Sequence, residues 1–346
     1  MNGPQDLGNS NAFWTGFLVV MVWMVIYPFL FGAMEAYDAA FFLINIPLAL
    51  GVSLLWGYGG VLSFGQVAFF GIAGYAYGIM AGNFYNPVFG TLLGALLALL
   101  LAGIVAAVFG YFIFYGRVKN WILPVMTLVF TLVVEKFMAQ TAGYQWKVGR
   151  VLLGGYNGMT GIPSLKFGDF IIEDTAFYYM ALGVAVFCFL GLRVYINSHS
   201  GVVITAIRED ELRTEMLGYD IRLVQVKIFI IAALLAGLSG LLYVQWGNYI
   251  NPSSMGLLQA SLPVVWVAVG GRSSFIAVVI CTYLLNYIGY QLAAQGNQYA
   301  FLIMGTLLVC SMVFFPEGAV VMFAKSRIGK KLGEIGRKRK RRAFKP

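Results

Sequence analysis

The stretch GYGGVLSFGQ, residues 57–66, places four glycines, a serine and a glutamine inside a region that is otherwise apolar. In hydrocarbon an unpaired backbone amide is costly, so a glycine-rich break in a membrane segment survives only where protein or a water-filled cavity covers it. The stretch therefore predicts a broken membrane segment. Its backbone is either covered by neighbouring helices or lines a route for a polar solute.

The composition of the whole chain predicts an integral membrane protein. Of its 346 residues, 60% are hydrophobic and 11% are charged, with a mean hydropathy of +0.81, which is far more apolar than a soluble domain. A spanning helix needs about 20 mostly apolar residues. The expected fold is all-α, a polytopic membrane helical bundle of about ten spans. The apolar segments are 12–32, 39–56, 60–82, 88–115, 120–140, 176–196, 223–245, 257–270, 273–292 and 299–315.

Two of these segments differ from a regular span. Segment 60–82 is interrupted by glycine and segment 257–270 is short, so each is either a half-helix or a re-entrant piece shielded by its neighbours.

The segments divide the chain into three parts. These are an amino-terminal tail (1–11), a transmembrane domain (12–315) and a basic carboxyl-terminal tail (316–346). The transmembrane domain has an outer loop at 141–175 and an inner loop at 197–222.

The distribution of positive charge predicts that both termini are cytoplasmic. With ten crossings and a cytoplasmic carboxyl tail, only Lys147, Arg150 and Lys166 fall in outer loops, as the positive-inside rule expects. The net charge of +9 is thus mainly a topology signal, with attraction of the tail to anionic lipid. No folded domain accompanies the run RKRKRR (337–342), so we expect no nucleic acid partner. The inner basic residues are Arg117, Lys119, Arg208, Arg213, Arg222, Arg272 and all eleven Lys and Arg of 325–345.

The scarcity of ionisable residues in the spans bears on the energy source. Of fourteen Asp and Glu, only Glu135 lies well inside a segment, next to Lys136. The two residues form either a partly hydrated pair or a contact to a partner helix. A proton-coupled carrier needs intramembrane relays, so this class is disfavoured and sodium coupling is weakened. We expect energy to come from another polypeptide, with a passive small-solute channel as the rival class.

Enzyme and metal chemistry have few residues to use. The chain has one histidine, His199, and no cluster of carboxylates, so neither a catalytic residue nor a metal site is predicted.

The inner loop carries a pattern typical of a short amphipathic helix. Val203, Ile207, Leu212 and Met216 recur at spacings of three to five residues, and Gly218 suits a helix end. Such a helix either lies on the membrane or docks on a protein, and its acidic excess favours a protein. The polar positions are Arg208, Glu209, Asp210, Glu211, Arg213 and Glu215.

Five ordered motifs resemble the permease subunits of bacterial ABC importers for branched-chain amino acids, urea and short-chain amides. They span about residues 40 to 320, most of the chain. The motifs are WGYGGVLSFGQVAFFGIAGYAYGIMAG (56–82), GGYNGMTGIP (154–163), AIREDELRTEMLGYDIRLVQVKIFIIAALLAGLSGLLY (206–243), WVAVGGRSS (266–274) and FPEG (315–318).

The resemblance implies a set of partners in a bacterial inner membrane. A second, related permease subunit would complete the pathway, two cytoplasmic ATPases would bind ATP and Mg, and a periplasmic or surface binding protein would deliver the solute. No cofactor is expected in this chain itself. The motifs WGYGG and WVAVGGR look more similar to the urea branch. Urea or a related small neutral or zwitterionic solute is therefore the first expectation, and branched-chain amino acids are the alternative.

The resemblance also assigns the inner loop as a coupling loop. Residues 211–218 match the segment that seats in a groove of the ATPase, so Arg208, Glu209, Asp210, Glu211, Glu215 and Gly218 are the expected coupling residues. Arg213 stands where a small residue is usual in the family, and Gln66 stands where histidine is frequent.

Two further groups of residues are candidates for function. In the broken segment, Ser63 and Gln66 would offer hydrogen bonds to a solute, with Gly59, Gly60 and Gly65 beside them. The alternative is that the glycines form a helix packing face. In the outer loop, Tyr156, Asn157 and Thr160 are candidates for docking the binding protein, the alternative being a loop that caps the bundle.

A short internal echo suggests how the spans are organised. GYGGVL (57–62) recurs as GLSGLL (237–242), near the second and seventh spans. If ten helices are two sets of five, the second set enters the membrane inverted relative to the first. A five-plus-five inverted repeat is therefore possible.

Overall fold

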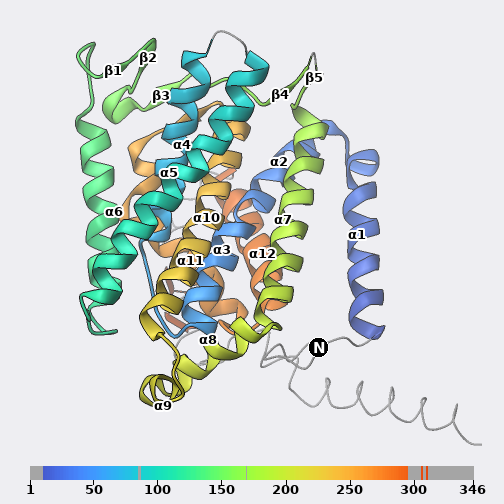
Figure 1. Cartoon of the computed structure of the whole chain (residues 1–346). Helices are drawn as coiled ribbons and strands as arrows, with labels where there is room; N and C mark the ends of the chain where they lie inside the picture. The colour runs from blue at the N-terminus through green and yellow to red at the C-terminus, as the bar shows by residue number, and fades with distance from the viewer. Residues whose placement is uncertain (1–10, 85–86, 169, 295–304, 307–308, 311–346) are drawn as a thin grey trace, which may run out of the picture.

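The computed structural model describes residues 11–84, 87–168, 170–294, 305–306 and 309–310. Long helices run side by side between the two ends of the molecule (Figure 1). Within the described residues, seven helical segments are long and apolar enough to cross a membrane. They are Phe13–Phe31, Ala33–Tyr58, Val88–Tyr115, Leu123–Gln140, Asp174–Ile196, Ile221–Gly247 and Phe275–Ala294.

The structure confirms a polytopic helical bundle, and each of the nine expected segments up to residue 292 contains helix. The short segment is α11 (Leu257–Gly270), and the glycine-broken segment contains α4 (Gln66–Asn83). The tenth segment, 299–315, and the tails at 1–10 and 316–346 lie outside the described residues, apart from four positions between 305 and 310.

The first two helices are closer in sequence than expected. α1 (Asn11–Phe31) is followed directly by α2 (Ala33–Ile44), and the chain reverses at Gly32, whose φ of 96° favours glycine. The expected segments 12–32 and 39–56 leave residues 33–38 as a loop, and this is wrong, because Glu35 and Asp38 belong to α2. After α2 the chain continues through α3 (Ile46–Ser53) and a π-helical turn, η1 (Leu54–Tyr58), which are almost fully buried. We call α2, α3 and η1 together the rod.

The glycine-rich stretch after η1 forms an extended piece of chain that leads into α4. The backbone of Phe64 is satisfied by side chains of α6 (Leu123–Gln140). Its N–H donates to Thr127 Oγ1 at 3.1 Å, and the Thr131 hydroxyl, shared with the Thr127 carbonyl, donates to its carbonyl at 3.2 Å. The break is thus covered by a neighbouring helix, as the cost of an unpaired amide in hydrocarbon requires.

The core lies where α10 (Ile221–Gly247) crosses the rod and α4. The crossing is close because glycine stands at its contacts: a Cβ added at Gly240 would overlap the Phe70 carbonyl, and one at Gly51 would lie 2.9 Å from the Ala232 carbonyl oxygen. α5 (Pro87–Tyr115) packs on α4 and α10, and α12 (Phe275–Ala294) packs on α3.

The edges of the bundle carry exposed apolar side chains. α1 stands at one edge beside α7 (Asp174–Ile196), and α6 stands at the opposite edge (Figure 1). On α1, Val19, Trp23 and Phe29 are among the exposed residues. Such surfaces suit contact with lipid or with another membrane helix.

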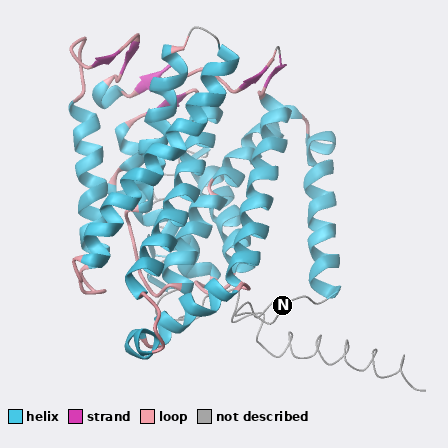
Figure 2. Ribbon diagram, in the orientation of Figure 1, coloured by secondary structure: helices cyan, strands magenta, loops and turns pink. Residues whose placement is uncertain are grey.

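One end of the molecule carries all the strands of the described residues, which Figure 2 shows as short arrows in magenta. Each pair is antiparallel and only two residues long, so the all-α class stands. The pairs are β1 (Lys147–Val148) with β2 (Val151–Leu152), β3 (Met159–Thr160) with β6 (Tyr249–Ile250), and β4 (Lys166–Phe167) with β5 (Phe170–Ile171).

The internal echo does not mark equivalent positions. Residues 57–62 include the end of η1 and extended chain, whereas residues 237–242 lie inside the regular helix α10. The two sequences therefore adopt different structures, and the five-plus-five repeat stays a prediction.

Candidate functional site

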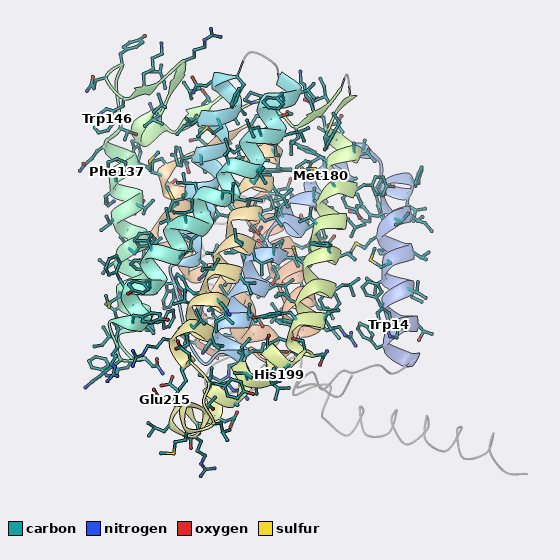
Figure 3. All side chains as sticks on the ribbon, viewed as in Figure 1. Trp14, Phe137, Trp146, Met180, His199 and Glu215 are labelled. Atoms are coloured by element: carbon teal, nitrogen blue, oxygen red, sulfur yellow. The ribbon has the colours of Figure 1, made fainter. Side chains whose placement is uncertain are left out.

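The coupling loop and the outer loop lie at opposite ends of the bundle. Glu215 and His199 are at one end and Trp146 at the other, and Trp14, near the start of α1, lies toward the Glu215 end (Figure 3). We call the Glu215 end the inner end and the strand end the outer end, following the predicted orientation.

The coupling loop contains two helices and not the single helix expected. α8 (His199–Glu209) ends where Asp210 adopts an extended conformation (φ −159°, ψ 102°), and α9 (Glu211–Met216) begins. The Asp210 carboxylate accepts a hydrogen bond from the Arg213 N–H at 3.1 Å, which is an N-cap. Gly218, with a φ of 89°, follows the end of α9, as its sequence position predicted.

The interruption between α8 and α9 at Asp210 divides the apolar positions of the coupling loop into two groups. Val203 and Ile207 on α8 are buried against the bundle. On and after α9, by contrast, Leu212, Met216 and Leu217 are 70%, 86% and 74% exposed. An apolar patch on a short projecting helix is typical of a surface that binds another protein.

Polar residues beside the interruption at Asp210 hold the coupling loop to the bundle. The Glu211 carboxylate accepts hydrogen bonds from Asn120, in the loop before α6, at 3.1 Å and from Gln225 on α10 at 3.2 Å. Arg208 pairs with Glu209 and also donates to the carbonyl of Gly57 at 2.6 Å. Of the expected coupling residues, Glu215 is exposed on α9. The structure thus places all six in or beside one projecting segment.

The five expected pathway residues are mainly in contact with protein atoms. A Cβ at Gly59 would lie 2.6 Å from Ile228, and one at Gly65 would lie 3.1 Å from Thr127. Gly60 faces Arg208, and the Ser63 hydroxyl accepts from the N–H of Gly65. Gly59, Gly60 and Gly65 therefore allow close packing of the glycine-rich stretch against its neighbours.

Gln66 differs from its neighbours because its polar atoms have no partner. The side chain is 1% exposed, and neither its amide nitrogen nor its amide oxygen has a hydrogen bond. A buried, unpaired polar group costs about 1–3 kcal/mol. Gln66 is thus the pathway candidate with hydrogen-bonding capacity to spare.

We expect Gln66→Leu to lower solute uptake roughly tenfold or more without loss of assembled protein, since it removes hydrogen bonds to the solute but none to the protein. The measurement is initial uptake rate in proteoliposomes, normalised to reconstituted protein. Gln245→Leu is the control for a structural glutamine: Gln245 Oε1 accepts from the Leu165 N–H at 2.6 Å, so this change should lower thermal stability. Unchanged uptake in Gln66→Leu would remove Gln66 from the pathway.

The outer candidates lie on the surface. Tyr156, Asn157 and Thr160 are exposed, and the Asn157 carbonyl accepts from the Tyr249 hydroxyl at 2.8 Å. Beside them is a hollow of about 430 Å³, to which Arg150 and Thr160 contribute. The loop is tightly folded around glycine, because a Cβ at Gly154 would overlap the Gly158 carbonyl. Both readings of the loop, a docking surface and a cap, are compatible with this shape.

Two further sequence expectations concern the Glu135–Lys136 pair and metal binding. Glu135 and Lys136 form an ion pair at 3.4 Å, as one of the two sequence interpretations expected. Among the described residues there is no group of three or more His, Cys, Asp or Glu placed to hold a metal.

Sequence reasoning missed several residues at the site. Thr127 and Thr131 were not singled out, although their i, i+4 spacing puts two hydroxyls on one face of α6. Asn120 and Gln225 carried no signal, because their partner Glu211 lies far away in the sequence.

The fold and the projecting segment define a multi-span membrane protein of the permease class. The chain belongs to the family described as "Branched-chain amino acid transport system / permease component", whose model matches residues 36–312. The match begins within α2, so α1 precedes it.

Curated relatives agree with the family. The chain is 26% identical over 333 residues to the high-affinity branched-chain amino acid transport system permease protein LivM of Escherichia coli, covering 88% of this chain and 75% of the relative. It is also 26% identical to LivM of Salmonella typhimurium, over 88% of this chain and 74% of the relative. A probable LivM of Methanocaldococcus jannaschii is 23% identical over 49% of this chain and 53% of the relative. No solved structure gives a significant match. These relatives are named as transport subunits and not as enzymes.

Proposed function

We propose that this chain forms half of the membrane pathway of an ATP-driven importer for branched-chain amino acids. The observation that carries the proposal is the family match over residues 36–312, together with two relatives named as branched-chain amino acid permeases. Urea, the first expectation from the motifs, is not confirmed. The names of the relatives favour the alternative.

The inner end supports a drive by separate ATPases. The apolar residues Leu212, Met216 and Leu217 project from α9, where a soluble subunit would reach them. The ATPases would carry ATP and Mg, so this chain would need neither. In the described spans, Glu135 is paired with Lys136, and Asp38 of α2 accepts a hydrogen bond from the Tyr290 hydroxyl at 2.9 Å, so both carboxylates have protein partners.

The remaining partners follow from the same proposal. A second, related permease would pack against an exposed apolar edge of the bundle, and a periplasmic or surface binding protein would dock at the outer end around Tyr156, Asn157 and Thr160. The chain would lie in a bacterial inner membrane with the coupling loop and both termini in the cytoplasm.

The proposal is tested by uptake in proteoliposomes that contain this chain, its partner permease, two ATPases and the binding protein. We expect ATP-dependent accumulation of leucine, isoleucine or valine that excess urea or acetamide does not inhibit. Accumulation of urea but not of these amino acids would reject the substrate. Uphill accumulation by the permease subunits alone, without any ATPase, would reject the importer class.

A further inference from the structure

Two membrane segments far apart in the sequence meet at their inner ends through glycine. One is the end of η1 with the residues that follow, 57–60. The other is the turn between α11 and α12, residues 271–274. A Cβ at Gly57 would overlap the carbonyl group of Arg272, so the contact is made backbone to backbone. We call these the two inner turns.

Buried side chains tie the inner turns together. The Ser53 hydroxyl donates to the Arg272 carbonyl at 2.8 Å, and the Tyr58 hydroxyl donates to the Ser273 carbonyl at 2.7 Å. Ser53 and Tyr58 are 0% and 1% exposed. The contact therefore joins the two inner turns beside the extended piece that leads up to Gln66.

Arg208 of the coupling loop reaches the same contact from outside the membrane segments. Its Nη1 donates to the Gly57 carbonyl at 2.6 Å and lies 3.5 Å from Ser273 Oγ, so it touches both inner turns. Its Nε and Nη2 donate to Glu209 at 3.1 Å and 2.5 Å. The side chain covers Gly60, where an added Cβ would lie 2.9 Å from Arg208 Cγ.

The position of Arg208 in the chain connects this contact to α9. Arg208 lies in the last turn of α8, and α9 begins three residues later, after the break at Asp210. α9 itself carries the exposed apolar patch. A displacement of α9 would therefore be transmitted to Arg208 through a very short length of chain, which includes Glu211 and its hydrogen bonds from Asn120 and Gln225.

We propose that Arg208 is a positioning residue that clamps the two inner turns while α9 is at rest and releases them when α9 is displaced. The inner turns then separate and the extended piece becomes accessible from the cytoplasm. This inference rests on the proposed function for its trigger, an ATPase on α9. The clamp itself is a property of this chain alone.

The test uses a thiol placed behind the clamp. Val61 is 2% exposed and follows Gly60 directly, so Val61→Cys reports the opening of the inner turns. In a background without the native cysteines, labelling is measured with a membrane-impermeant maleimide added to the cytoplasmic side of inside-out vesicles. We expect Arg208→Ala to raise the labelling rate about tenfold or more, because it removes charge-assisted hydrogen bonds. Arg208→Lys, which keeps one donor, should restore most of the protection.

Two controls separate a clamp from general loosening. Arg222→Ala removes an inner arginine whose guanidinium lies over the ring of Tyr115, 6.0 Å from its centroid, and it should leave labelling unchanged. Tyr58→Phe weakens the inner contact by removing the hydrogen bond to the Ser273 carbonyl and leaves Arg208 in place. It should raise labelling but leave its response to ATP intact in the full complex, whereas Arg208→Ala should label quickly with or without ATP.

The outcomes are distinct. Equal labelling in Arg208→Ala and Arg222→Ala would overturn the clamp. An ATP response in Arg208→Ala like that of Tyr58→Phe would overturn its link to α9. Failure of the unaltered complex to hydrolyse ATP or to take up solute would count against the proposed function, while labelling of the permease alone would still decide the clamp.

Discussion

Gly240→Ala is expected to prevent the bundle from assembling in its folded form. Gly240 lies on α10 where this helix crosses α4, and a Cβ there would overlap the carbonyl of Phe70. The three nearest atoms all belong to the Phe70 backbone, so no side chain can turn aside to make room. Overpacking a core costs about 1–3 kcal/mol even where side chains can adjust. We expect at least about 3 kcal/mol here, with the two helices forced apart.

The measurement is the fraction of protein that elutes as a monodisperse species in detergent, together with its apparent melting temperature. Gly247→Ala is the matched control, because Gly247 lies on the same helix and a Cβ there has nothing within 4 Å. That change should leave the protein as stable as before or raise its stability by up to about 1 kcal/mol, since alanine is the better helix former. Equal melting temperatures for the two variants would contradict the close crossing.

Local sequence predicted where the helices lie because hydrocarbon imposes a simple rule on length and polarity, whereas seven of the described helical segments are long and apolar enough to cross a membrane and the count of ten stays a prediction. The glycine break was also readable, since the exclusion of unpaired amides from lipid applies to any fold. The division of the coupling loop was not. Val203, Ile207, Leu212 and Met216 share one helical spacing, yet the first two pack on the bundle and the last two face outward. Only the packing of α8 against the membrane segments separates these two groups.

The inner contact was beyond sequence reasoning for a different reason. Arg208 and Gly57 are 151 positions apart, and Tyr58 and Ser273 are 215 apart. In the sequence, Arg272 contributed only to the positive-charge pattern that predicts topology. In the structure its backbone carbonyl accepts a hydrogen bond from Ser53, and every residue type has such a carbonyl. A contact built from backbone acceptors leaves no characteristic residue pattern. By contrast Gln66 was singled out from its polarity and from the family resemblance, and the structure adds that its amide is unpaired.

Removing the apolar surface of α9 is expected to abolish ATP-driven uptake while leaving the membrane subunit folded. Leu212, Met216 and Leu217 are largely exposed, so changing all three to Asp removes little packing within the chain. In a docked complex, buried apolar anchors contribute about 2 kcal/mol or more each. Charges in their place would be desolvated without partners. We therefore expect binding of the ATPases to weaken by roughly a hundredfold or more.

The measurement is retention of the ATPases when the permease is captured on a column, with uptake measured in parallel. Val202→Asp is the matched control, since Val202 is an exposed apolar residue on α8, outside the patch. It should retain the ATPases. Equal retention by the triple variant would place the docking surface elsewhere on the inner end. Loss of retention in both variants would extend the surface onto α8, and Arg208 would then lie between two docked helices instead of behind one.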